Sequence, residues 1–238
     1  VQTAGPFGRP LISNVRHHIR ITVDTYNDRF LRGESTLLLD GDQRTVVEFE
    51  EQQLRAKFEK FLRTASSEAQ LQYFLETNPI LIPGLYDLHN GPKANVVISK
   101  LRLADEYVTD FAFISENSAF CQITLVEIES PNIQIFHKSD GLFTAEFSRA
   151  LQQPRDWHQW CAQHPTQLKD TFCRIYHRSL FKFQRVAIRC VLVAGRRVQV
   201  ERSARRQERW AGANSDPSVV VMTYDRMLDY LSVNPRLL

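Results

Sequence analysis

Three carboxylates in the middle of the sequence are spaced as they would be in a site for a hard metal ion. Asp110 stands at the inner end of a predicted strand, and Glu127 and Glu129 follow in a second predicted strand. Side chains alternate across a strand, so Glu127 and Glu129 would share a face, and a hairpin would bring Asp110 beside Glu127. Convergent carboxylates suit Mg²⁺ or Mn²⁺, which can bind a phosphate oxygen and lower the pKa of a bound water. An ordinary strand with two Glu on its wet face would show the same pattern.

A fourth carboxylate, Glu68, lies at the start of a predicted helix. Ser67 can cap this helix, and Gln70 follows three residues later as in a capping box. Glu68 shares a helix face with Leu71 and Leu75, so it is expected to lean toward the side that packs inward. There it would need a partner such as a metal or a cation. The helix dipole alone would also favour an acid in this first turn.

Positive charge is concentrated in one stretch of the sequence. The whole chain has a formal charge of only +3. Between residues 174 and 209, eleven Lys or Arg stand against two acids, a net of +9, so the rest of the chain carries −6. A surface that follows nucleic-acid phosphates needs such asymmetry, because each neutralised phosphate releases counterions. A solvated basic helix, with Glu201 pairing Arg205, would explain the run equally well.

The elements that must position these residues change in character near residue 50. Alternating apolar and polar residues over 19–23 predict a strand, and the pattern over 37–49 predicts a hairpin. Residues 1–50 are therefore expected to form a β-rich segment that can belong to a longer N-terminal region. From Glu50 on, apolar residues recur at intervals of three and four, as in an amphipathic helix. We expect a separate domain over residues 51–238.

Helices and strands alternate through this second domain. Pro154 must kink or split one of the helices, because its amide cannot donate a hydrogen bond. The alternation predicts the α/β (α+β) class, with a central mixed sheet flanked by helices. Predicted helices begin at residue 50 and cover residues 67–78, 142–163 and 201–211, with a last short one after 225; predicted strands cover residues 94–100, 106–114, 121–129, 186–194 and 218–224.

Composition and the remaining motifs exclude several classes of protein. Apolar residues make up 43% of the chain and charged residues 24%, which excludes disorder as the dominant state. No apolar run approaches about twenty residues and no basic-then-apolar leader occurs, so neither a membrane span nor export is expected. The four cysteines form no CxxC pair, which favours reduced, mostly buried thiols and a cytoplasmic protein. No Gly-rich phosphate loop occurs, so no nucleotide cofactor is expected.

Five segments of the sequence carry a family resemblance when they are taken in order. They are SEAQLQYFLETNP at 67–79, YVTDF at 107–111, LVEIESP at 125–131, ALQQ at 150–153, and a C-terminal stretch that runs from VLVAGR at 191–196 through a basic helix to VMTYD at 221–225. In this order they resemble the Shedu family of anti-phage defence proteins, whose nuclease domain belongs to the PD-(D/E)XK superfamily. The resemblance covers about residues 50–231 and implies a restriction-endonuclease-like core.

The resemblance implies a role for each matching residue. Asp110 and Glu127 would hold a divalent metal, Mg²⁺ or Mn²⁺, and Glu68 would be the helical acid that reaches the metal from the side. Gln153 would stand at the family's helical glutamine position, at the edge of the site, where it would orient substrate or water. Gln152 is the alternative for this position. The family also implies a homo-oligomer.

Glu129 departs from the superfamily pattern, which usually has Lys at this position. A lysine ammonium there can help to position the attacking water and neutralise developing charge. Three interpretations follow. Glu129 acts as a general base or a further metal ligand, Lys138 or Lys100 supplies the cation from elsewhere, or the site is degenerate and only binds. We favour an active site.

The leading hypothesis is a divalent-metal-dependent endonuclease that hydrolyses phage or other foreign DNA, with Glu68, Asp110, Glu127, Glu129 and Gln153 as its catalytic residues. A degenerate nuclease-fold module that binds nucleic acid or regulates without cleaving is the first alternative. An assembly subunit with its interface in residues 1–50 is the second. Contacts to the DNA backbone are predicted at Lys138, Arg149, Arg196, Arg197, Arg202, Arg205 and Arg206.

Overall fold

A six-stranded mixed sheet forms the centre of the computed structural model, which describes residues 9–12, 41–65, 67–82, 96–116, 121–176 and 185–230. Across the sheet the strands are β1 (Arg9–Ile12), β2 (Val96–Ser99), β5 (Phe111–Glu116), β6 (Cys121–Ile128), β7 (Val186–Val193) and β8 (Val219–Met222). A separate two-stranded sheet joins β3 (Arg102–Leu103) to β4 (Tyr107–Val108).

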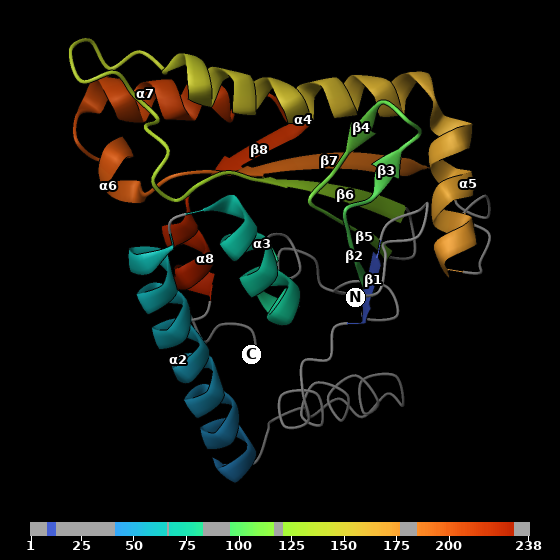
Figure 1. Ribbon diagram of the computed structural model, residues 1–238, viewed down its shortest axis with the longest axis horizontal. Coiled ribbons are helices and arrows are strands. Elements are labelled where there is room, and N and C mark those ends of the chain that lie inside the picture. The colour runs from blue at the N-terminus through green and yellow to red at the C-terminus, as the bar shows by residue number, and fades with distance from the viewer. Residues whose placement is uncertain are drawn as a thin grey trace.

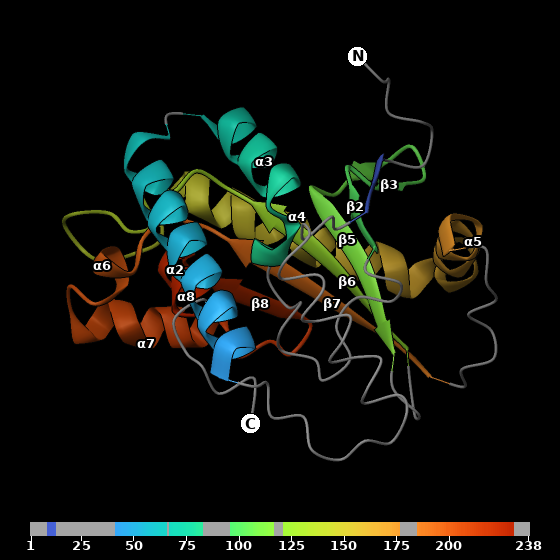
Figure 2. The same ribbon diagram turned by 90° about the horizontal axis from the view of Figure 1, so that it is seen from below.

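Helices cover both faces of the main sheet (Figure 1). On one face lie α2 (Gly41–Thr64), α3 (Glu68–Thr77) and α8 (Tyr224–Tyr230), and on the other lie α4 (Ala145–Gln163) and α7 (Ala204–Ala213). The remaining helices are α5 (Pro165–Tyr176), the short α6 (Arg197–Val200) and a 3₁₀ turn, η1 (Pro79–Leu81). Seen from below, α2 and α3 lie in front of the strands and α4 behind them (Figure 2). The predicted α/β (α+β) class with a flanked mixed sheet is confirmed.

The pairing of the strands explains why the sheet is mixed. β1, β2, β5 and β6 pair antiparallel, whereas β6–β7 and β7–β8 are parallel. Parallel neighbours need a crossover, which α4 and α5 provide for the first pair and α6 and α7 for the second. β6 and β7 lie between two helical layers, which is why most of their residues are apolar.

The two faces of the sheet bury separate apolar clusters. Phe111 and Val126 pack with the α2, α3 and α8 side, whereas Ala112 and Leu125 pack with the α4 side. Because side chains alternate along a strand, Glu127 belongs to the same face as Leu125. The sheet thus fixes the direction of this carboxylate before any contact is considered.

The N-terminal prediction is wrong over residues 41–49, which are helical rather than half of a hairpin. Helix α2 begins at Gly41, well before the predicted start at Glu50. Gln43, Arg44 and Glu48 are good helix formers, and the short apolar run among them is too brief to impose a strand. The strand predicted over 19–23 lies outside the described residues, and the domain division at residue 50 stays a prediction.

Two further predictions needed correction. The strand expected over 106–114 is divided between the two sheets, because the chain leaves β4 and the Thr109 amide donates to the Leu101 carbonyl before β5 begins. The helix expected over 142–163 begins at Ala145, where the Thr144 hydroxyl accepts from the Phe147 amide. Pro154 does not split this helix, and its side chain is buried.

Gly195 allows a close approach at the end of β7. Its φ of +63° favours glycine, and an added Cβ would lie 2.7 Å from Cδ1 of the buried Ile135. The Gly195 amide donates to the Ser130 carbonyl, and its carbonyl accepts from the Tyr224 amide. The residues that follow Glu129 are held against the sheet in this way.

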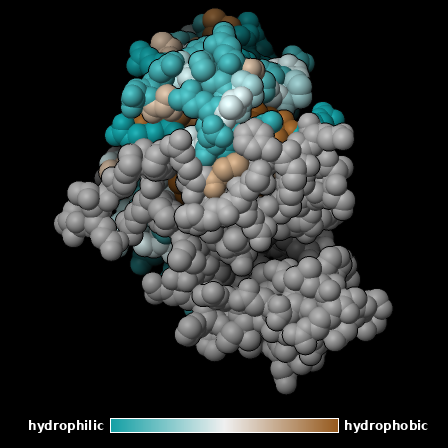
Figure 3. Space-filling model, turned by 90° about the vertical axis from the view of Figure 1, so that its right-hand side faces the viewer, coloured by the Kyte–Doolittle hydropathy of each residue, from teal (hydrophilic) through white to brown (hydrophobic). Residues whose placement is uncertain are grey.

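The surface, the cysteines and the helix lengths of the described residues can also be compared with the sequence. The end of the molecule that carries α5 shows mostly hydrophilic residues where it is described (Figure 3). None of the four cysteines, all of them among the described residues, forms a disulfide, and Cys121, Cys161 and Cys190 are buried, as expected. None of the described helices combines the length and the apolar character that a bilayer span requires.

Candidate functional site

The β5–β6 pairing places Asp110 beside Glu127, as the predicted hairpin requires. Phe111 faces Val126 across the ladder, and the Asp110 amide donates to the Val126 carbonyl at 3.1 Å. In return, the Ile128 amide donates to Oδ2 of Asp110 at 2.8 Å. Asp110 and Glu127 are both buried, with 4% and 7% of their surface exposed. Two carboxylates therefore meet where water can do little to screen them.

Burial and neighbouring charge alter the protonation of the two glutamates. Burial, followed by the charge of Asp110 and a hydrogen bond with it, raises the pKa of Glu127 far above its usual range. Without a metal ion, Glu127 therefore keeps its proton near neutral pH and can donate it in a hydrogen bond to Asp110. Burial, followed by the charges of Glu68 and Asp110, raises the pKa of Glu129 to about 7. Binding of a metal ion would therefore favour the ionised forms of Glu127 and Glu129.

Glu68 joins this group from α3. The Ser67 hydroxyl accepts from the Gln70 amide at 3.3 Å, so the predicted cap of α3 is confirmed. Glu68 itself is exposed rather than inward-facing, because it is the first residue of α3 and the residues of that helix become buried only from Leu71 on. Its carboxylate nevertheless belongs to the same electrostatic site, since partial burial and then the charge of Asp110 raise its pKa.

Lys100 is the cation of the site. Its ammonium pairs with Oδ1 of Asp110, and its backbone amide donates to the Asp110 carbonyl at 2.9 Å. Burial opposes its charge, but Asp110, by attraction and a hydrogen bond, and then Glu68 and Glu127 raise its pKa above the usual value. Lys100 has a φ of +53°, a conformation that costs a non-glycine residue free energy. Of the two lysines, Lys100 and Lys138, that the sequence offered as the cation of the site, Lys100 contacts an acid of this group.

A polar network behind Asp110 holds α3 against the sheet. The side-chain amide of Gln72 donates to the Ser99 hydroxyl at 3.0 Å and to the Glu76 carboxylate at 3.1 Å, and it lies 3.5 Å from the Asp110 carbonyl. The sequence reasoning did not assign Gln72 a role. The sequence feature that could have revealed it is a polar residue one turn after Glu68, on the face of the helix that carries Leu71 and Leu75.

Tyr224 supports Glu129 in a similar way and was also missed. Its hydroxyl donates to the Glu129 carbonyl at 2.6 Å, and the Glu129 amide donates to the Val193 carbonyl at 2.8 Å. Tyr224 is fully buried, and its ring makes a T-shaped contact with that of Phe58. These contacts fix the backbone at the point where β6 ends, so the direction of the Glu129 side chain is set by the fold.

The chemistry of the donors fits a hard divalent ion. Glu68, Asp110, Glu127 and Glu129 offer only carboxylate oxygens, which Mg²⁺ and Mn²⁺ prefer. No three acidic, histidine or cysteine side chains of the described residues already form a set that could hold a metal. The Lys100 ammonium instead compensates the charge of Asp110. An ion held by Asp110 and Glu127 would have to take over that compensation.

The two glutamines of α4 lie in different surroundings. Gln152 is exposed and donates to Asp156 at 2.8 Å, one turn along the same helix. Gln153 is half-buried and stands two turns after Glu146, whose charge acts on Glu129. Gln153 is thus on the side of α4 nearer the acids, and its role stays a prediction.

Three of the seven predicted DNA-contacting cations have partners inside the protein. Arg196 pairs with Asp225 through two nitrogens, Arg197 pairs with Asp229, and Arg206 donates to the carbonyls of His137 and Gln199. These arginines connect α6, α7 and α8 to their neighbours. The other four, which have exposed positions, are Lys138, Arg149, Arg202 and Arg205.

Glu127→Gln is expected to stabilise the metal-free protein at about pH 8 by at least about 1.4 kcal/mol, the free energy of one pKa unit. The pKa of Glu127 is higher in the folded protein than in the unfolded chain, so the unfolded chain releases a proton that the folded protein keeps. Stability therefore falls as pH rises above the ordinary value of 4.5, and an uncharged Gln removes this fall.

Denaturant unfolding in the presence of a chelator, at about pH 5 and about pH 8, measures this effect. Glu208→Gln, at an exposed position of α7, is the matched control and should leave the pH dependence unchanged. Identical pH dependence in Glu127→Gln and the parent protein would contradict the raised pKa.

The acids, Lys100 and their supporting residues lie within one region of family similarity. The family description "Shedu protein SduA, C-terminal" matches residues 65–228, which is more than half of the chain and extends from just before α3 into α8. No curated protein matches this sequence. The match includes every acid of the site and its internal cation, and it shows that the chain belongs to the Shedu family, which associates it with defence against phages.

Proposed function

We propose that this chain is a divalent-metal-dependent endonuclease that hydrolyses DNA phosphodiester bonds in anti-phage defence. The observation that supports the proposal most strongly is the meeting of Asp110 and Glu127, with Glu68 and Glu129 within electrostatic range and Lys100 beside them. Burying two acids beside a single cation destabilises the folded protein, because like charges repel and burial removes the water that would screen them. Such strain is common where a protein binds or turns over a charged substrate.

Asp110 and Glu127 would hold Mg²⁺ or Mn²⁺, with Glu68 approaching from α3. When bound, this ion supplies a Lewis acid for a phosphate oxygen and lowers the pKa of a bound water. Glu129, with a pKa of about 7, suits the role of the base that takes a proton from the attacking water. The water oxygen attacks phosphorus, the bond from phosphorus to one ester oxygen breaks, and the leaving oxygen is protonated from solvent. Lys100 would stabilise the negative charge that grows on the phosphate.

The experiment that tests this proposal uses the whole chain, supercoiled plasmid DNA and Mg²⁺ or Mn²⁺. We expect nicked or linear DNA with the metal and intact supercoiled DNA when a chelator is added. Intact plasmid with both metals, at protein concentrations that bind the DNA, would contradict the proposal. DNA as partner and a homo-oligomeric assembly are part of the same proposal, the second from the family resemblance alone.

A degenerate module that binds DNA without cleaving it is the rival proposal, and Glu129 in place of the superfamily lysine is the observation that favours it. Glu129→Lys separates the two. If Glu129 works as a base, the lysine variant is expected to lose cleavage by about a hundredfold. Cleavage that appears only in Glu129→Lys would instead show that the site had decayed. Gel analysis of plasmid cleavage measures both outcomes, with Glu129→Gln as the variant that removes charge without adding a cation.

A further inference from the structure

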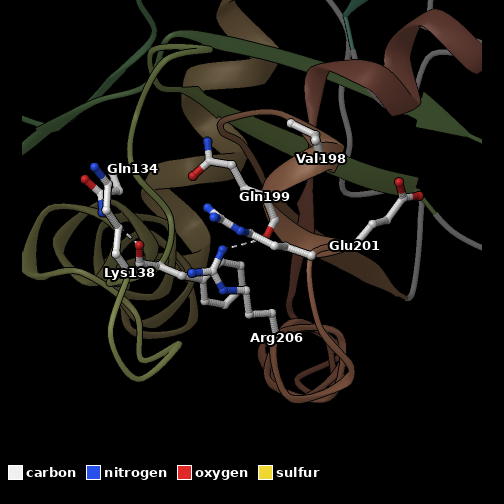
Figure 4. A pocket seen from close by; sticks show the side chains of 8 residues that line it. Gln134, Lys138, Val198, Gln199, Glu201 and Arg206 are labelled. Carbon is white, nitrogen blue, oxygen red and sulfur yellow. Dashed lines mark hydrogen bonds between the residues drawn. The ribbon is translucent and has the colours of Figure 1, made fainter.

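A basic cavity lies between residues 130–144 and the α6–α7 segment. It has a volume of about 430 Å³, and its lining includes Lys138, Arg202, Arg206, Phe136 and Val198 (Figure 4). In Figures 1 and 2 the loop between β6 and α4 lies beside α6 and α7. This loop leaves the sheet directly after Glu129, and the Gly195 amide, just before α6, donates to the Ser130 carbonyl. The cavity is thus reached from the same end of β6 as the acids.

The walls of the cavity are held by hydrogen bonds rather than by packing alone. Gln199 of α6 clamps the loop, because its side-chain oxygen accepts from the Ile135 amide at 2.9 Å and its nitrogen donates to the Ile133 carbonyl at 2.8 Å. The Thr144 hydroxyl donates to the Gln134 carbonyl at 2.6 Å and closes the other end of the loop. A preformed wall loses little conformational freedom when a ligand binds.

The three cations of the cavity have two different roles: Arg206 connects its walls, and Lys138 and Arg202 lie exposed at its rim. Arg206 is buried, lies 5.2 Å from the centroid of the Phe136 ring, and donates to the His137 carbonyl at 3.0 Å. It joins the two walls and leaves a positive charge between them. Lys138 and Arg202 occupy exposed positions at the rim. The acid of the lining, Glu201, points away from Lys138 and Arg206 in Figure 4.

We propose that this cavity is a phosphate subsite that holds the DNA backbone beside the bond to be cleaved, an inference that rests on the proposed function. Lys138 and Arg202 would contact phosphate oxygens, and Arg206 would position the walls. Val198, which is 73% exposed, would offer apolar surface to a sugar or a base. The shared chemistry is that of a phosphate group, and the position at the same end of β6 as the acids favours a phosphate of the DNA strand over a free one.

The test compares DNA binding by three single variants in the presence of a chelator, so that cleavage does not interfere. Lys138→Ala and Arg202→Ala are each expected to weaken binding of duplex DNA by about three- to tenfold and to reduce the salt slope by about one. Arg102→Ala removes an exposed cation of β3, outside the cavity lining, and should bind DNA like the parent protein. Fluorescence anisotropy over a salt series measures affinity and slope together.

Several results would decide the inference. If Lys138→Ala and Arg202→Ala bind DNA with the parent affinity and salt slope, the inference is wrong. It is also wrong if the two variants bind inorganic phosphate or a mononucleotide more weakly but bind duplex DNA as the parent protein does. Weaker, less salt-dependent DNA binding supports the subsite even if the parent protein cleaves nothing, so a failure of the proposed hydrolysis is recognised separately in the plasmid assay.

Discussion

Asp110→Asn is expected to reduce metal-dependent DNA cleavage by about a thousandfold or more, with little change in DNA binding. Asp110 is the acid on which the site converges, since it contacts Lys100, the Ile128 amide and Glu127. The asparagine has nearly the same shape and can still accept from the Ile128 amide. It lacks the charge that a divalent ion requires, so the loss should fall on chemistry rather than on folding.

Rates of plasmid nicking under saturating DNA, and separate binding measurements with chelator, give the two quantities. Asp105→Asn changes an exposed carboxylate in the turn between β3 and β4 and serves as the matched control. Thermal unfolding of both variants shows whether the fold is kept. Cleavage that persists at the parent rate in a folded Asp110→Asn protein would exclude this group of acids as the catalytic site.

Lys100→Met should reduce cleavage by about a hundredfold, the usual effect of removing one group that stabilises transition-state charge. The substitution keeps a long side chain and leaves the strained backbone, with its φ of +53°, in the same conformational class. It removes the only charge-compensating group that the described structure shows on Asp110. Lys100→Arg, which keeps the charge but changes its geometry, should recover part of the rate.

A metal titration distinguishes a catalytic Lys100 from a mere counter-ion. If the lysine acts in catalysis, Lys100→Met loses rate even at saturating Mn²⁺. If it only competes with the ion for Asp110, the variant keeps the parent rate and reaches half of it at a lower Mn²⁺ concentration. The second result would contradict the role given to Lys100 here and leave the metal site intact.

The part of the site built on strands follows from the sequence because its rules are local. Alternation in β6 sets the face of Glu127, and the β5–β6 hairpin sets its neighbour, Asp110. The start of α3 follows from the Ser67 cap in the same way. Each of these features depends on a few neighbouring residues, so the pattern alone is enough to predict them.

The features that the sequence left open or did not predict depend on distant pairings. The sequence offered Lys100 and Lys138 as candidates for the cation, and Lys100 reaches Asp110 because β2 pairs with β5 and the chain then turns through a left-handed conformation. Tyr224 meets Glu129 across 95 residues of sequence. The internal partners of Arg196 and Arg197 lie in α8, so a basic run that reads as a DNA surface is partly structural. No local pattern reports such contacts.

The prediction of a β-rich segment is wrong over residues 41–49 for a different reason. Its apolar residues alternate over too few positions to distinguish a strand from a helix turn, and the helix formers around them decide the outcome. Pro154 shows the converse, since tertiary packing keeps α4 continuous through a residue that weakens it locally.

A crystal structure of the protein soaked with Mn²⁺ tests the central claim most directly, because manganese is located by its anomalous scattering. The expected result is an ion bonded to carboxylate oxygens of Asp110 and Glu127 at about 2.0–2.3 Å, with the Lys100 ammonium moved away from Oδ1 of Asp110. An ion bound elsewhere, with Lys100 still paired to Asp110 at saturating Mn²⁺, would contradict the account.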